Sequence, residues 1–234
     1  MTGDSNLNVM VSVAFKGLLE RIEPEYRQTT GFGFAPIYAP AGTVVRRVRS
    51  GTTADLVIVT PETMKLLIDE GLGVAGSEHN IATSVIGIAV RAGAPRPKID
   101  TADDLRHALL AARSVAYTDP STGAASGVHF VQLLERFGIA ETVKAKAKLG
   151  DGGPVAEFVA RGEADIAIQQ LCEHMLVPGV DVVGPLPDEL NKTTTFMAGV
   201  AKSATAPNEA AALIRLLLAP HVRAAMPSHG LRPA

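Results

Sequence analysis

Two stretches of the chain share one pattern: Ser50-Gly-Thr-Thr-Ala-Asp-Leu-Val-Ile-Val, residues 50–59, and Arg161-Gly-Glu-Ala-Asp-Ile-Ala-Ile-Gln, residues 161–169. In both, a helical segment stops at a glycine, an Ala-Asp pair soon follows, and an apolar run then has the character of a buried strand. A unit that occurs twice indicates two similar halves. Because strands and helices alternate along the chain, we predict an α/β fold with two mainly parallel sheets flanked by helices.

The remaining elements follow from hydrophobic periodicity and turn residues. We predict strands at residues 7–13, 34–38, 55–59, 84–90, 115–117, 166–170, 180–183 and 193–200. We predict helices at residues 15–26, 44–49, 61–70, 102–112, 128–137, 154–161, 208–218 and 220–226. Thr43 is the expected N-cap of the second helix, and Thr101 with Asp104 forms a capping box for the fourth.

A loop of small residues follows one predicted strand, in the sequence S-V-A-Y-T-D-P-S-T-G-A-A-S-G-V-H-F, residues 114–130. It leads into a helix, and the first amides of a helix have no internal partner and carry partial positive charge. The loop therefore suits an anion, to which Ser121, Thr122 and Ser126 could add hydroxyl donors. The alternative is an ordinary strand-to-helix turn, in which Asp119 bonds its own backbone.

Composition limits the functional classes. Hydrophobic residues make up 47% and charged residues 20%, which allows a packed core, and the net charge of −2 gives no footprint for nucleic acid. One cysteine excludes a disulfide framework, and no apolar run is long enough for membrane insertion. The first residues do not resemble a signal peptide, so we expect a cytoplasmic protein, or a periplasmic one if a leader has been removed.

The chain resembles the type II periplasmic solute-binding proteins, especially the molybdate-binding proteins of ABC transporters. The resemblance rests on residues 8–19, 39–58, 118–127 and 161–168. It implies two lobes, residues 1–82 with 199–234 and residues 83–198, joined by crossover strands at 84–90 and 193–200. It also implies a small anionic ligand in a cleft between the lobes, and an ABC permease as partner if the protein is exported.

Residues 168–190 are similar to a branch of that family that includes aconitate isomerases. Molybdate-binding relatives place serines in the first two loops and a tyrosine in the fourth, where this chain has Ala14, Ala41 and Gln170. Without these hydroxyls, a bound molybdate would have too few hydrogen-bond donors. The sequence therefore favours a di- or tricarboxylate ligand over molybdate. We therefore expect a carboxylate-binding protein. The alternatives are a cofactor-independent aconitate isomerase, a molybdate-binding transport component, and a cytoplasmic ligand-sensing domain.

The expected ligand-binding residues belong to four loops that follow strands. They are Ser12, Ala14, Lys16, Ala41, Gly42, Thr43, Arg46, Thr60, Ser121, Ser126, Gly127, Gln169 and Gln170. Arg46 and Arg47 are expected in the first turn of their helix, where one guanidinium could bind a carboxylate in a bidentate way. Gln169 and Gln170 are both expected to contact the ligand.

Candidate catalytic residues are His129, which follows the anion loop, and Glu173, which with His174 could form an acid–base pair. The alternatives are a histidine on a helix surface and a solvated Glu-His pair. Cys172 has no activating neighbour and is expected to serve packing. The histidines lack the spacing of a metal site, and no nucleotide-binding motif is present, so we expect neither metal nor cofactor.

Overall fold

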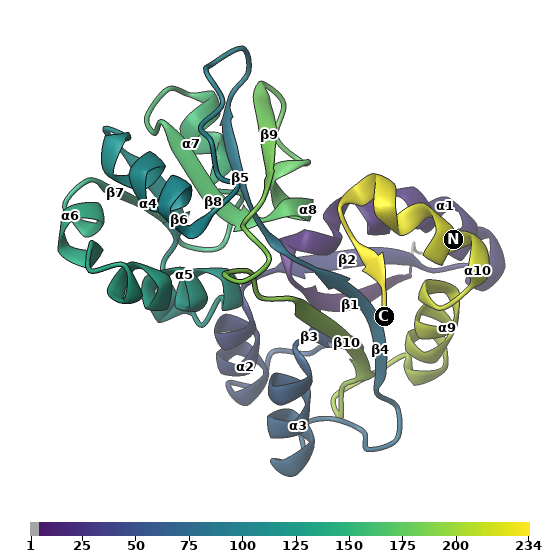
Figure 1. Cartoon of the computed structure of the whole chain (residues 1–234). Coiled ribbons are helices and arrows are strands. Elements are labelled where there is room, and N and C mark those ends of the chain that lie inside the picture. Colours follow the sequence, from purple (N-terminus) through teal and green to yellow (C-terminus); the bar gives the residue numbers. More distant parts are fainter. Residues whose placement is uncertain (1–4) are drawn as a thin grey trace. The chain divides into compact units, whose positions relative to one another are not determined.

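The computed structural model describes residues 5–234, which divide into two compact units (Figure 1). Unit 1 comprises the chain up to Thr83 together with Thr195–Ala234, and unit 2 comprises Ser84–Thr194. The sequence predicted the changes of lobe at 82/83 and 198/199. The chain thus leaves unit 1 once, builds all of unit 2, and returns.

Unit 1 contains a six-stranded sheet in the order β11-β4-β10-β3-β1-β2. Strand β1 (Asn6–Val11) pairs in parallel with β2 (Gly33–Tyr38) and β3 (Leu56–Val59), and β10 (Thr194–Val200) runs antiparallel to β3. Strand β4 (His79–Ser84) pairs antiparallel with β11 (Arg232–Pro233). The carboxyl ends of β1, β2 and β3 therefore lie at the same edge of the sheet, together with the loops that follow these strands.

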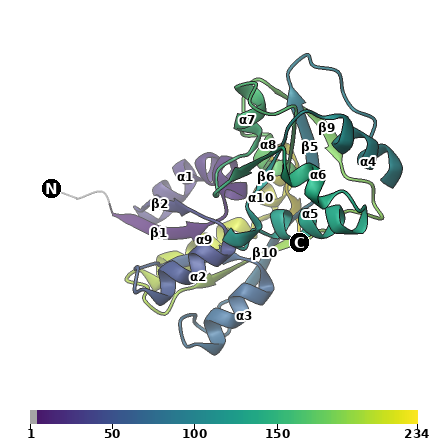
Figure 2. The same ribbon diagram turned by 90° about the vertical axis from the view of Figure 1, so that its left-hand side faces the viewer.

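Helices cover both faces of the unit 1 sheet (Figures 1 and 2). Helices α2 (Ala41–Arg49) and α3 (Pro61–Asp69) pack on the face that presents Met10, Val57 and Val59. The other face carries η1 (Val13–Phe15), α1 (Lys16–Thr30), α9 (Pro207–Leu217), α10 (Pro220–Ala225) and η3 (Met226–His229). The hydroxyl of Tyr26 donates to the Glu209 carbonyl at 2.7 Å and ties α1 to α9.

Unit 2 contains a five-stranded sheet in the order β7-β6-β8-β5-β9. Strand β6 (Val115–Thr118) pairs in parallel with β7 (Ala147–Gly150) and β8 (Ile166–Gln170). Strand β5 (Ile86–Arg91) runs antiparallel to both β8 and β9 (Val180–Pro185). In both units, therefore, the strand that follows the repeated Ala-Asp pair lies between a parallel and an antiparallel neighbour.

The two faces of the unit 2 sheet differ in side-chain size. One face presents large residues such as Val115, Tyr117 and Ile168 to α4 (Ala102–Ala111), α5 (Ala125–Arg136) and α6 (Ala140–Lys144). The other presents Ala116 and Ala167 to α7 (Ala156–Ala160). Helices η2 (Pro120–Thr122) and α8 (Leu171–His174) complete the unit. Period-two alternation of large and small residues sets this arrangement.

The repeated aspartates perform matching tasks. Asp55 accepts hydrogen bonds from the backbone amides of Asn8 (2.8 Å), Thr205 (2.7 Å) and Ala206 (3.0 Å). Asp165 accepts from the backbone amide of Arg113 at 2.8 Å. Each aspartate immediately precedes its strand and bonds the backbone beside the neighbouring parallel strand. The repeat in the sequence therefore reflects a repeated device that sets strand register.

Several predicted boundaries were wrong. Thr43 is not an N-cap, because α2 begins at Ala41 with Pro40 as its N-cap, and Arg46 lies in the second turn rather than the first. The predicted strand 84–90 is divided between β4 and β5, and α5 begins three residues before the predicted start. Elements β7, β11, α6 and α8 were not predicted. Thr101 caps α4 as expected, accepting from the Asp104 amide at 3.1 Å.

Candidate functional site

The first turn of α5 has free backbone donors. Its N-cap residue is Ala124, whose side chain makes no capping bond, and the first amide bonded within the helix is that of Val128. The amides of Ala125, Ser126 and Gly127 have no partner among the described residues. A helix of twelve residues with an apolar N-cap leaves donors and dipole charge available for an anion.

The loop before α5 is built as a turn. The carboxylate of Asp119 accepts from the Ser121 amide at 2.8 Å, and the hydroxyl of Thr122 donates to the Asp119 carbonyl at 2.6 Å. Gly123 closes the turn with a φ of 75°, which favours glycine. Asp119 is therefore a turn former, the alternative weighed from sequence, and the Thr122 hydroxyl is engaged in the turn.

Gly127 and Thr118 bring α5 close to the end of β6. A Cβ on Gly127 would lie 2.2 Å from the Thr118 carbonyl oxygen, so no larger residue fits without moving backbone. The hydroxyls of Thr118 and Ser126 belong to buried residues, and that of Thr118 has no partner within residues 5–234. Thr118 was not among the residues predicted from the sequence, although its position at the end of an apolar strand was a usable signal.

The two glutamines at the end of β8 have different roles. Gln169 accepts from the Val155 amide at 2.8 Å and donates to the Gly153 carbonyl at 3.2 Å. It therefore holds the loop before α7, and the expected contact of Gln169 with a ligand stays a prediction. Gln170 donates to Thr194 at 2.8 Å, and its carbonyl oxygen is buried without a partner among the described residues.

The candidate acid–base residues differ from one another in their surroundings. His129 is bonded through Nε2 to the Leu190 carbonyl at 2.7 Å, which leaves Nδ1 as the nitrogen for chemistry. Glu173 and His174 are both buried, so neither is solvated. Burial lowers the pKa of His174 to about 4 despite its bond to the Gly87 carbonyl, and the imidazole is therefore neutral at pH 7.

Cys172 is buried and donates to the Ser84 hydroxyl at 3.3 Å. Burial, first, and the nearby Glu173 charge raise the pKa of its thiol, so it is not a nucleophile. This agrees with the packing role expected from sequence. Among residues 5–234, no group of three His, Cys, Asp or Glu side chains could hold a metal ion. No helix in that range is long and apolar enough to cross a membrane.

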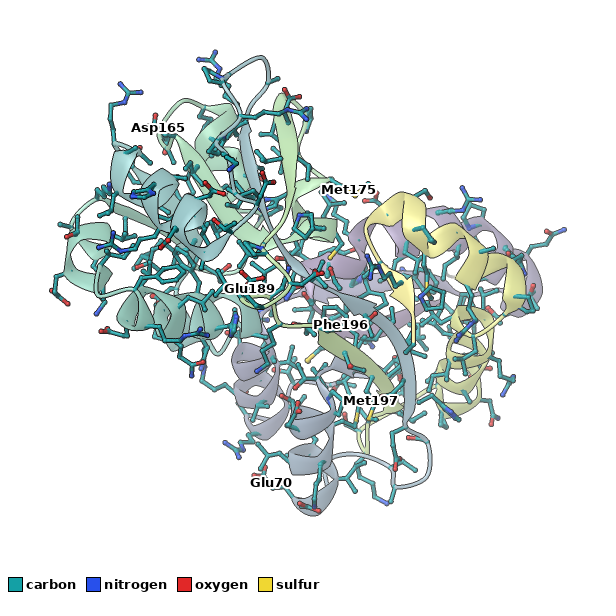
Figure 3. All side chains as sticks on the ribbon, viewed as in Figure 1. Glu70, Asp165, Met175, Glu189, Phe196 and Met197 are labelled. Atoms are coloured by element: carbon teal, nitrogen blue, oxygen red, sulfur yellow. The ribbon has the colours of Figure 1, made fainter. Side chains whose placement is uncertain are left out.

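The first loop of unit 1 follows β1. Ser12 caps η1 and accepts from the Ala14 amide at 3.3 Å, while Ala14 itself is buried. Phe15 packs edge-on against Phe196 of β10, with ring centroids 5.2 Å apart. Phe196 is labelled in Figure 3. Lys16 lies 4.0 Å from Glu20 and is half exposed. The structure therefore uses Ser12 locally and leaves Lys16 in a weak surface pair.

The second and third loops of unit 1 begin α2 and α3. Ala41 and Gly42 are the first residues of α2, which has no side-chain cap, so its start resembles that of α5. Thr43 accepts from the exposed Arg46 guanidinium at 2.8 Å. Thr60 caps α3 by accepting from the Thr63 amide at 3.4 Å. Of these residues, Ala41 and Gly42 have the donors that best suit an anion.

A family model described as "Bacterial extracellular solute-binding protein" matches residues 7–232. An aconitate isomerase from a Pseudomonas species is 32% identical over 98% of this chain and 88% of its own length. The molybdate-binding protein ModA from Escherichia coli K12 is 21% identical over 86% of this chain and 79% of its own length. The sequence similarity thus extends through both units.

Solved structures share the fold. The periplasmic molybdate-binding protein of Azotobacter vinelandii aligns with a TM-score of 0.81 at 18% identity, covering 98% of this chain and all of that one. Peb3 from Campylobacter jejuni aligns with a TM-score of 0.70 at 14% identity, again over 98% of this chain and all of that one. At these identities the structural likeness establishes the two-lobed α/β fold.

Proposed function

This chain belongs to the family of bacterial extracellular solute-binding proteins, and we propose that it binds a small organic anion carrying two or three carboxylates. The observation that carries the proposal is the uncapped first turn of α5. Three backbone amides there have no partner in the described part of the chain, and the buried Thr118 hydroxyl is also unpartnered. Within unit 1, the start of α2 has the same uncapped form.

The chemistry of the loops favours a carboxylate over molybdate. Ala14 and Ala41 occupy the loop positions where the resemblance implies serine hydroxyls, and Ser12 is bonded within its own turn. An oxyanion left short of two donors would lose about 1–3 kcal/mol for each. A carboxylate is planar and accepts fewer bonds per group, so the backbone amides at one helix start suit it.

Aconitate isomerisation is a second candidate, favoured by the relative that is 32% identical over nearly the whole chain. The reaction moves a proton along an allylic system. A base removes a proton from the methylene carbon, the electron pair shifts across the double bond, and a proton is added at the far carbon. Composition is unchanged and no cofactor is needed. His129 is the base we propose, since its Nδ1 is not used by the bond to Leu190.

Proton NMR with trans-aconitate in D₂O tests both candidates. Conversion to cis-aconitate at a rate proportional to protein, with deuterium entering the product, supports the isomerase. Saturable line broadening without conversion supports a receptor only. His129→Gln keeps a donor for Leu190, so it should abolish conversion and retain binding. If neither broadening nor conversion occurs, and molybdate instead protects the protein thermally, the carboxylate proposal fails.

Ser126→Ala tests the site itself. We expect it to weaken aconitate binding several-fold, because a buried hydroxyl beside the free amides is lost. Ser228→Ala is the control, since Ser228 is an exposed serine outside the loops expected to bind the ligand, and its hydroxyl donates to the Ala225 carbonyl. The family's extracellular description favours a periplasmic location over a cytoplasmic one, and in a transport role the partner would be an ABC permease.

A further inference from the structure

We propose a second binding site in unit 2, for an amphiphilic monocarboxylate, at the sheet end where β6 and β8 begin. A cavity of about 570 Å³ opens there, and Asp165, labelled in Figure 3, belongs to its wall. The site described above lies where the same strands end, at Thr118 and Gln170. The two sites therefore involve opposite ends of one sheet, and this proposal does not depend on the function proposed above.

The cavity has an apolar floor. Its lining includes the methyl groups of Ala108, Ala111 and Ala112 at the end of α4, together with Ile166 at the start of β8. Alanine at these positions leaves space that a larger residue would fill. A volume of this size falls in the range of small-molecule sites, which are mostly apolar with a few polar groups that fix orientation.

Three guanidinium groups line the cavity, and one of them is neutralised. Arg113 binds Asp165 in a bidentate way, with Nε–Oδ2 at 3.1 Å and Nη2–Oδ1 at 2.8 Å. That hydrogen bond from Arg113 outweighs the effect of partial burial and holds the pKa of Asp165 below its ordinary value. The pair is therefore ionised at neutral pH and forms a fixed part of the wall.

The other two guanidinium groups are less fully paired. Arg96 lies 3.8 Å from Asp181, whose carboxylate already accepts from the Gly93 amide at 3.1 Å. Arg91 forms no ion pair within residues 5–234, and its Nη1 lies 3.8 Å from the position of a Cβ on Gly162. Arg91 therefore adds unpaired positive charge to a cavity that also contains apolar surface, and Arg96 adds a guanidinium held only by a long, exposed ion pair.

This combination selects the ligand class. A guanidinium binds a carboxylate through two parallel hydrogen bonds, and the alanine floor accommodates an aliphatic chain. A small inorganic anion would leave the floor unused, and a neutral hydrocarbon would leave Arg91 without a partner. A short-chain fatty acid satisfies both parts of the cavity.

The test uses the intact chain with octanoate as probe. Octanoate is titrated into ¹⁵N-arginine-labelled protein while the side-chain Nε–H signals are followed by NMR. We expect saturable shifts of the Arg91 and Arg96 signals, with Arg215 of α9 in unit 1 unchanged. Arg91→Ala should weaken octanoate binding at least tenfold. Arg136→Ala is the matched control, because Arg136 is an exposed arginine of unit 2 outside the cavity lining.

Two further probes make the result decisive. Acetate, which lacks the chain, and 1-octanol, which lacks the charge, should each shift the Arg91 signal far less than octanoate at equal concentration. Octanoate binding that persists unchanged in both Arg91→Ala and Arg96→Ala would overturn the proposal. So would equal binding of octanol, or the absence of any shift at Arg91.

Discussion

Asp55 shows how one buried carboxylate connects three segments of the chain. It is 1% exposed and accepts from the backbone of Asn8 in β1 and of Thr205 and Ala206 before α9. Burial alone would raise its pKa, but these hydrogen bonds outweigh burial and hold the pKa below its ordinary value. The charged form of Asp55 therefore stabilises the folded protein.

We expect Asp55→Asn to lower the free energy of unfolding by about 2–3 kcal/mol at pH 7. The asparagine side chain has one accepting oxygen, and its NH₂ group would face a backbone N–H donor that the second carboxylate oxygen now accepts from. Because the folded pKa is depressed, the stabilisation by Asp55 is complete above about pH 4 and is lost as pH falls below it. Urea unfolding at pH 7 and pH 3 measures both effects. Asp69→Asn, at an exposed pair with Lys65, should change stability by less than about 0.5 kcal/mol.

His174 also lowers the stability of the protein as pH falls, through a buried neutral imidazole rather than a buried charge. Its folded pKa of about 4 lies below the ordinary value of 6.5, because burial disfavours the charged form. As pH falls from about 6.5 to about 4, the unfolded chain takes up the proton first, and the folded state loses about 3 kcal/mol. His174→Gln should flatten that slope in urea unfolding between pH 7 and 4.5. A slope that survives in the variant, or that His107→Gln removes equally, would contradict the assignment.

At the scale of elements, the start of α5 gives the sharpest test of the anion site. Ala125 is the first residue of the helix, where proline is well tolerated because that N–H is not needed by the helix. Ala124 already has the extended backbone that a following proline requires. We expect Ala125→Pro to leave the melting temperature unchanged or higher and to weaken aconitate binding about tenfold. Ala102→Pro, at the first position of α4, is the control that should leave binding intact.

The sequence predicted the elements better than the roles of single side chains. Strand β8 was predicted residue for residue, because an apolar run after Ala-Asp has few alternatives. The start of α2 was missed because Ala39-Pro40-Ala41-Gly42 offers no capping side chain. Thr43, the next residue with a capping side chain, was therefore predicted as the N-cap. Gln169 and Gln170 have different partners because neighbouring residues of a strand point to opposite faces. The contacts of Gln169 with Val155 and of Gln170 with Thr194 show that separation.

At the scale of the whole molecule, the two units differ in the number of chain segments that form them: unit 1 has two and unit 2 has one. Unit 2 is one continuous segment, Ser84–Thr194, with its own sheet and buried clusters. Asn191 holds its end to its beginning, donating to the Ile86 carbonyl at 2.9 Å and accepting from the Ile86 amide at 3.0 Å. Such a segment meets the requirements of an independent domain.

We therefore expect residues 84–194, produced alone, to fold. The fragment should show dispersed amide NMR signals and cooperative urea unfolding, and Asn191→Ala should destabilise it by about 1–3 kcal/mol. Residues 1–83 alone should not fold, because their sheet lacks β10. A fragment 84–194 that gives collapsed, non-cooperative spectra under the same conditions would show that unit 2 needs the rest of the chain.

The place of β10 in the unit 1 sheet, between β3 and β4, also determines when that sheet can be completed. During synthesis the ribosome releases β1, β2, β3 and β4 long before β10, and unit 2 emerges in between. The edge of β3 therefore has no partner strand during the time in which unit 2 is already able to fold. Unpaired strand edges are the sites where nascent chains associate wrongly. Unit 1 is thus the later of the two units to be completed, and its sheet can become native only when residues 195–234 are free.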